Sequence, residues 1–153
     1  MQRTVVIDCF RDSVEAYRNG YAIVAVDVIR ATTTAVTAVA RGRRCYPVPS
    51  IEAAVALARK SELSLLVLGE TANMSGEYAS RSTLELPGRQ QELLEKIAAL
   101  GKPVVLVIVS GRPLSISWAS EHVPAIVMAW QPGSEAGNAI ANILFGDANP
   151  GGH

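Results

Sequence analysis

The chain is predicted to fold as an α/β protein, a three-layer α/β/α sandwich with a mostly parallel sheet of the flavodoxin-like or Rossmann-like type. Short aliphatic runs alternate with amphipathic segments from end to end, which is typical of strands joined by crossover helices. Several runs are almost continuously apolar, as in strands covered on both faces. The length of 153 residues suits one core, so we expect one domain over residues 1–153.

Six short apolar runs predict the strands. They occupy residues 4–10, 21–28, 43–48, 63–68, 104–109 and 123–130. The run 104–109 is the clearest, because every one of its residues is aliphatic. Pro47 places the third strand near an edge of the sheet or marks its end, and Pro124 weakens the prediction of the last strand.

Helical segments separate these runs. We expect them at residues 12–19, 35–41, 51–59, 87–100, 114–119 and 135–145. Ser50 precedes the third segment and is its expected N-cap. The fourth segment opens at Pro87-Gly88, and its apolar stripe consists of Leu93, Leu94, Ile97 and Leu100. With right-handed crossovers, this order of strands and helices predicts a doubly wound sheet.

The composition argues against several classes of partner. Lys plus Arg equals Asp plus Glu at 14 each, so no net field attracts nucleic acid or an anionic membrane. The N-terminus lacks the apolar core of a signal peptide, and no apolar run reaches the roughly 20 residues of a membrane span. We expect a soluble cytoplasmic protein with no nucleic-acid or membrane partner. Cys9 and Cys45 are expected to be small buried hydrophobes, with a disulfide or a reactive thiol as the alternatives.

One candidate site follows the second predicted strand. Asp27 ends that strand, and Arg30 with Thr32, Thr33 and Thr34 surrounds the next helix start. Arg30 and the three hydroxyls would bind a phosphate or another small anion, and Asp27 would hold a metal such as Mg²⁺ beside it. The alternative is purely structural: Thr32 caps the helix, and Asp27 pairs with Arg30.

A long polar loop follows the strand predicted at residues 63–68. It contains Glu70, Glu77 and Arg81. A loop carboxyl group acts as a general acid when its surroundings raise its pKa, and the alternative is a solvated side chain. Arg112 follows the strand at residues 104–109, and it either binds an anion or fixes a loop carbonyl group. A loop this long inside a compact domain is usually functional.

Residues from about 65 to 152 resemble the second, α/β sandwich domain of glycoside hydrolase family 3, the β-glucosidase family. The matching phrases include Leu68-Gly69-Glu70, Met74-Ser75-Gly76-Glu77, Leu86-Pro87-Gly88 with Gln90-Gln91-Glu92-Leu93-Leu94, Ser110-Gly111-Arg112-Pro113-Leu114 and Gly137-Asn138-Ala139-Ile140. The resemblance implies that Glu77 takes the position of the acid/base glutamate. It also implies that the nucleophilic aspartate belongs to a separate barrel domain. The chain contains no such barrel, so Glu77 would be vestigial and hydrolysis by the chain alone is not expected.

Residues from about 4 to 59 are similar instead to the 2-phosphosulfolactate phosphatase family, a group of Mg²⁺-dependent enzymes. The phrase that carries this similarity is Val26-Asp27-Val28-Ile29-Arg30-Ala31-Thr32-Thr33-Thr34, supported by Tyr46-Pro47-Val48 and Ile51-Glu52-Ala53-Ala54. The similarity implies that the first candidate site is a metal and phosphate region. Mg²⁺ is then expected only if that site survives, and otherwise no cofactor is expected.

Two half-families in one chain predict an engineered chimera. Its fragments would be about 1–62 and 63–153, spliced between Lys60 and Glu70, and it would test fold assembly without catalysis. Two alternatives remain: a residual Mg²⁺-dependent phosphatase or anion-binding module at Asp27 and residues 30–34, and an accessory domain fragment of a β-glucosidase. A formerly buried apolar face would also allow a homodimer.

Overall fold

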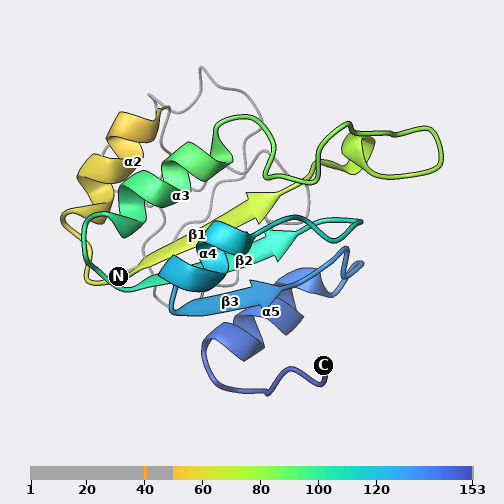
Figure 1. Cartoon of the computed structure of the whole chain (residues 1–153). Helices are drawn as coiled ribbons and strands as arrows, with labels where there is room; N and C mark the ends of the chain where they lie inside the picture. The colour runs from red at the N-terminus through yellow and green to blue at the C-terminus, as the bar shows by residue number, and fades with distance from the viewer. Residues whose placement is uncertain (1–39, 41–49, 153) are drawn as a thin grey trace, which may run out of the picture. The chain divides into compact units, whose positions relative to one another are not determined.

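The described part of the chain is an α/β structure built on a parallel sheet. The computed structural model describes Ala40 and residues 50–152. Within them the strand order is β1-β2-β3, with both strand pairs parallel (Figure 1). The strands are β1 (Ser64–Gly69), β2 (Val104–Val109) and β3 (Ala125–Met128). The α-helices are α2 (Ile51–Ala58), α3 (Gln90–Ala98), α4 (Ser117–His122) and α5 (Ala136–Leu144), and a short 3-10 helix, η2, spans Ala72–Met74. The predicted fold class is confirmed.

The chain divides into two compact units. One unit is Val48–Pro132, which contains the whole described sheet, and the other joins Met1–Pro47 to Gly133–His153 and contains α5. The prediction of a single domain stays a prediction.

The core of the Val48–Pro132 unit forms because strand side chains alternate between the two faces of the sheet. Leu66, Leu106 and Ile126 are aligned across β1, β2 and β3 and therefore share one face. The helices α2, α3 and α4 contribute Ala54, Ala58, Leu94, Ile97 and Ala119 to the same hydrophobic cluster. Strands added in one direction with right-handed crossovers place their helices on one face, which explains this arrangement.

Most elements predicted in the described residues are confirmed. The helix predicted at residues 87–100 is shorter than predicted, because α3 begins only at Gln90 and ends at Ala98. Ser50 caps α2 by accepting a hydrogen bond from the Ala53 amide at 3.2 Å. The last strand is shorter than predicted and begins only at Ala125, after Pro124. No helix within residues 50–152 has the length and apolar character required to cross a membrane. The strands predicted at residues 4–10, 21–28 and 43–48 and the helices predicted at 12–19 and 35–41 lie outside the described residues, apart from Ala40, which is helical.

The helix predicted at residues 114–119 is wrong in position. The observed helix α4 begins at Ser117, three residues later. Ser115 donates its backbone N–H to the carbonyl oxygen of Leu84 at 2.7 Å, so this segment is bonded to the long polar loop. Leu114 packs against the hydrophobic core. A contact with a distant segment therefore decides where the helix begins.

The core is continuous across the expected splice between Lys60 and Glu70. Helix α2 precedes that stretch and packs against α3, which follows it, and the two helices lie side by side (Figure 1). Lys102 Nζ donates hydrogen bonds to the carbonyl oxygens of Arg59 and Ser61, the latter at 2.7 Å. These contacts join the two sides of the expected splice in one folded unit.

Candidate functional site

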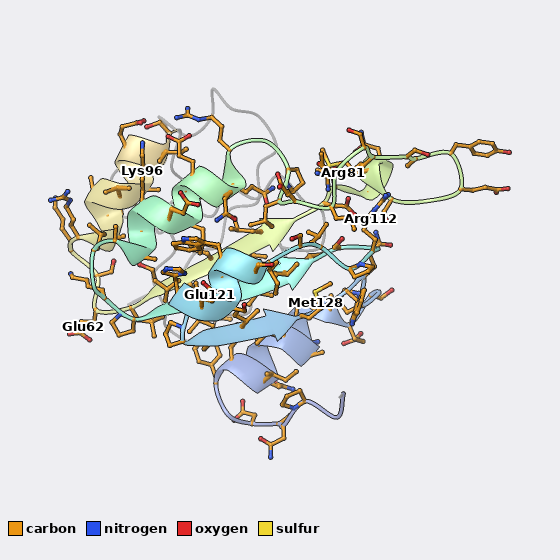
Figure 2. All side chains as sticks on the ribbon, viewed as in Figure 1. Glu62, Arg81, Lys96, Arg112, Glu121 and Met128 are labelled. Atoms are coloured by element: carbon orange, nitrogen blue, oxygen red, sulfur yellow. The ribbon has the colours of Figure 1, made fainter. Side chains whose placement is uncertain are left out.

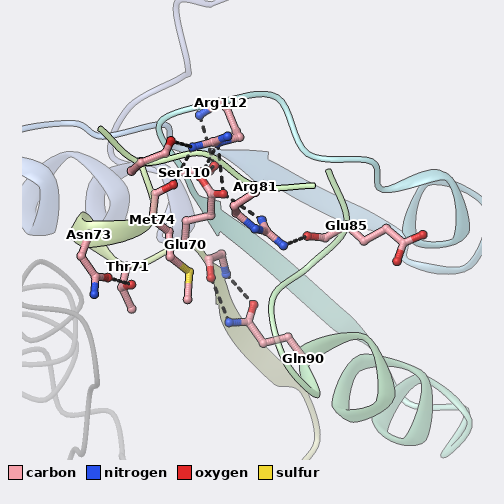
Figure 3. Close-up of polar contacts among 11 residues, drawn as sticks. Glu70, Thr71, Asn73, Met74, Arg81, Glu85, Gln90, Ser110 and Arg112 are labelled. Carbon is pink, nitrogen blue, oxygen red and sulfur yellow. Dashed lines mark hydrogen bonds and ion pairs between the residues drawn. The ribbon is translucent and has the colours of Figure 1, made fainter. Parts of the chain in front are cut away.

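A buried carboxylate lies directly beyond the carboxyl end of β1. Glu70 is only 2% exposed, and its backbone N–H donates to the carbonyl oxygen of Val109 at 2.9 Å, which extends the pairing of β1 with β2 by one residue. Open parallel sheets bind their ligands beyond the carboxyl ends of their strands. Glu70, Arg81, Ser110 and Arg112 form one hydrogen-bonded group, the Glu70 cluster (Figure 3).

Two arginines pair with Glu70 from different segments of the chain. Arg81 Nη1 lies 2.8 Å from Glu70 Oε1, and Arg112 Nε lies 3.2 Å from each carboxylate oxygen. Arg81 belongs to the loop after β1, whereas Arg112 follows β2, and both lie beyond the same edge of the sheet (Figure 2). A buried carboxylate requires such partners, since an unpaired buried charge is very costly.

Ser110 is the third side chain that hydrogen-bonds to Glu70. Its hydroxyl donates to Glu70 Oε2 at 2.8 Å and accepts from the Arg112 backbone N–H at 3.2 Å. Burial raises the pKa of Glu70, but hydrogen bonds from Arg81 and Ser110 and the charge of Arg112 lower it more, so the net pKa lies below its ordinary value. Glu70 is therefore ionised near neutral pH, with its oxygens engaged, and it cannot donate a proton as a general acid.

The same arginines close the neck of the acidic loop, which we define as residues 71–85. Arg112 Nη2 donates to the carbonyl oxygens of Met74 at 2.5 Å and Ala79 at 3.1 Å, one on the outgoing and one on the returning side of the loop. Arg81 Nη2 donates to the carbonyl oxygen of Glu85 at 2.8 Å. Each guanidinium thus binds Glu70 and loop backbone at once, which its fork of fixed donors permits.

The base of the acidic loop is fixed to α3 and to β2. Gln90 accepts a hydrogen bond from the Gly69 N–H at 2.7 Å and donates one to the Gly69 carbonyl at 2.9 Å. Gly69 has a φ of 138°, and a Cβ there would lie 1.9 Å from the carbonyl oxygen of Val109. Only glycine permits both this conformation and this close approach.

The tip of the acidic loop is a tight turn that carries Glu77 and Tyr78. Gly76 and Ala79 pair across the turn, and the Ala79 N–H donates to the Gly76 carbonyl at 3.1 Å. Tyr78 is 96% exposed, and Glu77 is exposed beside it. The loop projects beyond the carboxyl end of β1 (Figure 1).

The structure settles two alternatives left open by the sequence. Arg112 fixes loop carbonyl groups, which was one of its two predicted roles. Glu70 was predicted to be either a general acid or a solvated side chain. Both interpretations are wrong, because Glu70 is buried and its partners keep it ionised. Glu77 lies at an exposed turn, where a carboxylate is available to another molecule or domain.

Two members of the surroundings of Glu70 were not identified as site residues from the sequence. Ser110 and Gln90 both lie in phrases that resemble glycoside hydrolase family 3, and that similarity was the available signal. In contrast, Asp27, Arg30, Thr32, Thr33 and Thr34 lie outside the described residues, so the predicted anion and metal site stays a prediction. Within the described residues, no group of three or more His, Cys, Asp or Glu side chains is placed to hold a metal ion.

Together, these features define an α/β sheet domain with a rigidly braced acidic loop beyond the carboxyl edge of its strands. Comparison with known proteins identifies the family to which this domain belongs. The glycosyl hydrolase family 3 C-terminal domain matches residues 3–153. The chain belongs to this family.

Relatives and solved structures agree with that assignment. A beta-xylosidase from Formosa agariphila is 46% identical over 99 residues, or 65% of this chain and 14% of the relative. A periplasmic beta-glucosidase from Salmonella typhimurium is 41% identical over 106 residues, or 69% of this chain and 14% of the relative. The structure of a β-glucosidase from Erythrobacter marinus matches with a TM-score of 0.66 and 31% identity, covering 82% of this chain and 22% of that one. The chain therefore spans only a small part of these enzymes.

The expected chimera has no support from these findings. The family match extends over residues 3–153 and includes the whole stretch that resembles a phosphatase. The comparisons give no support to the similarity of residues 4–59 to the 2-phosphosulfolactate phosphatases. The family match therefore leaves one family for the chain.

Proposed function

We propose that this chain is the C-terminal α/β domain of a β-glycosidase and that it supplies Glu77 as the general acid/base. Glu77 would protonate the leaving-group oxygen as the glycosidic bond breaks and then deprotonate the water that releases the sugar. The nucleophilic carboxylate would come from another domain or chain. The relatives named above are β-glucosidases and β-xylosidases, so the proposed substrates are β-glucosides and β-xylosides.

The observation that carries this proposal is the contrast between Glu70, which directly precedes the acidic loop, and Glu77, which lies at its tip. Glu70 is buried and bonded to three side chains, so it serves the structure. Glu77 lies exposed at the tip of a turn, and the described residues provide it with no hydrogen bond or ion pair. A catalytic acid that must reach a substrate on another domain requires this combination of a free carboxyl group and a fixed backbone.

The proposal is tested in a hybrid enzyme. The matched segment of the Salmonella typhimurium β-glucosidase is replaced by the corresponding residues of this chain, and Glu77→Gln is compared with the unmodified hybrid. Aryl β-glucosides and β-xylosides with a poor and a good leaving group are assayed. Loss of a general acid lowers turnover by about 10²–10⁴-fold for the poor leaving group, and much less for 2,4-dinitrophenyl glycosides, which need no protonation.

Azide provides a second readout. Azide attacks a covalent glycosyl-enzyme without a general base, so it forms a glycosyl azide and restores turnover of the dinitrophenyl substrate in Glu77→Gln. Glu85→Gln is the matched control, because Glu85 is an exposed carboxylate in the same loop. Full turnover of the poor substrate by Glu77→Gln would contradict the proposal. So would a hybrid that unfolds cooperatively yet hydrolyses neither sugar.

A further inference from the structure

We propose that Arg112 is a positioning residue for Glu77 and that it acts through the closed neck of the acidic loop, with Glu70 and Arg81 fixing the guanidinium in place. This inference rests on the proposed function of Glu77. It assigns a supporting role to a second loop, because Arg112 lies in a different loop from the acid/base. Arg112 would touch neither the substrate nor the nucleophile.

The argument begins with the geometry of the neck. Met74 and Ala79 lie two residues and one residue, respectively, outside the span from Gly76 to Tyr78 that forms the tip. Arg112 Nη2 binds the carbonyl oxygens of both, at 2.5 and 3.1 Å. One nitrogen therefore joins the outgoing and returning chains just below the turn, and separation of the neck would break both hydrogen bonds.

The guanidinium is itself held in place. Its Nε lies 3.2 Å from both oxygens of Glu70, whose side chain has no exposed surface. Glu70 is in turn bonded to Ser110 and Arg81, and its backbone N–H is bonded to Val109 in β2. The neck is thus connected through three charged groups to the most buried strand of the described sheet, which is a rigid support.

The consequence for Glu77 is positional. It occupies a turn of two residues between paired Gly76 and Ala79, so a shift of the neck shifts its backbone. A displacement of about 1 Å in a reacting group can cost about 100-fold in rate. The exposed tip has few contacts of its own in the described residues. The hydrogen bonds at the neck therefore fix the position of the tip.

Hydrogen exchange of the 153-residue chain tests this inference directly. In Arg112→Met, which keeps the apolar stem and removes the donors, exchange of the Ala79 and Met74 amides should rise by about tenfold or more. Both amides bond within the loop, to Gly76 and Thr71. Amides of β2 should exchange as in the wild type. Arg89→Met is the matched control, because Arg89 bonds only the exposed Glu92 in the described contacts.

Two further variants keep the inference falsifiable if Arg112→Met folds poorly. Arg112→Lys keeps the charge but not the planar fork, so it should not restore slow exchange of the loop amides. Gly111→Ala changes no charge, but its Cβ would lie 2.1 Å from Ser75 Oγ and push on the neck. Loop exchange that stays at the wild-type rate in a folded Arg112→Met or Arg112→Lys variant would overturn the inference.

The leaving-group ratio in the hybrid enzyme separates positioning from stability. Loss of folded protein lowers the rates for poor and good leaving groups equally, whereas a displaced acid lowers the poor one selectively. We expect Arg112→Met to lower the ratio of poor to good substrate turnover by about tenfold or more, with little change in KM. If Glu77→Gln leaves the ratio unchanged, the proposed function fails. If Glu77→Gln lowers the ratio and a folded Arg112→Met does not, only the positioning role fails.

Discussion

Arg112 Nε lies 3.2 Å from Glu70 Oε2, and this contact joins the loop after β2 to the residue that directly follows β1. The carboxyl ends of two neighbouring strands are thereby connected by charged side chains as well as by the sheet. Polar groups that are all mutually satisfied in this way make a local structure specific, since any alternative arrangement leaves a buried charge without a partner. The acidic loop takes its shape from that requirement.

Removing the charge of Glu70 should destabilise the folded unit strongly. Glu70→Gln keeps the shape of the side chain but leaves Arg81 and Arg112 without a counter-charge in a partly buried place. We expect a loss of about 3 kcal/mol in the free energy of unfolding, measured with urea. Glu92→Gln, which removes an exposed partner of Arg89 and Lys96, is the control and should change stability far less. Equal effects from the two variants would contradict this account.

The contribution of Glu70 should depend on pH in a defined direction. Because the pKa of Glu70 is lower in the folded chain than in the unfolded chain, its stabilisation is present above the unfolded pKa and is lost as the pH falls through the folded one. The difference in unfolding free energy between the wild type and Glu70→Gln should be constant above about pH 5 and shrink below about pH 4. A difference that grows on acidification would show that the sign is wrong.

Gly69 should tolerate no side chain. In Gly69→Ala the new Cβ would meet the Val109 carbonyl at 1.9 Å, and the φ of 138° is itself unfavourable for alanine. We expect a loss of about 3 kcal/mol or more, measured by thermal or urea unfolding. Gly88→Ala is the control, because Gly88 also has a positive φ, 57°, but nothing lies within 4 Å of the new Cβ. Its cost should be only about 1–2 kcal/mol.

Lys102 should hold the end of α2 against the turn that precedes β2. Its ammonium donates to the carbonyl oxygens of Arg59 and Ser61, which a charged donor satisfies well. Lys102→Met should therefore lower the free energy of unfolding by about 1–2 kcal/mol in one cooperative transition. Lys96→Met removes an equal charge from an exposed pair with Glu92 and serves as the control. A Lys102→Met variant as stable as wild type would contradict this role.

The elements of the described sheet follow from local sequence. The unbroken aliphatic run of β2 predicts a buried strand, and Ser50 marks the start of α2 through an ordinary capping bond. The similar run of β1 also forms a strand, but Leu65 and Val67 on one of its faces are exposed. The start of α4 could not be predicted in the same way. It is set by the bond from Ser115 to Leu84, a residue that lies far away in sequence.

The sequence by itself determined the α/β class, the position of the acidic loop and the candidacy of Glu77, because apolar runs, loop composition and family phrases are properties of contiguous residues. Only the tertiary structure decided the roles of Glu70 and Arg112. The protonation of a buried carboxylate depends on groups brought to it from elsewhere, here Arg81, Ser110 and Arg112. The physical reason is that charge interactions act through space over a few ångströms, and parallel strands bring together loops that are about forty residues apart in sequence.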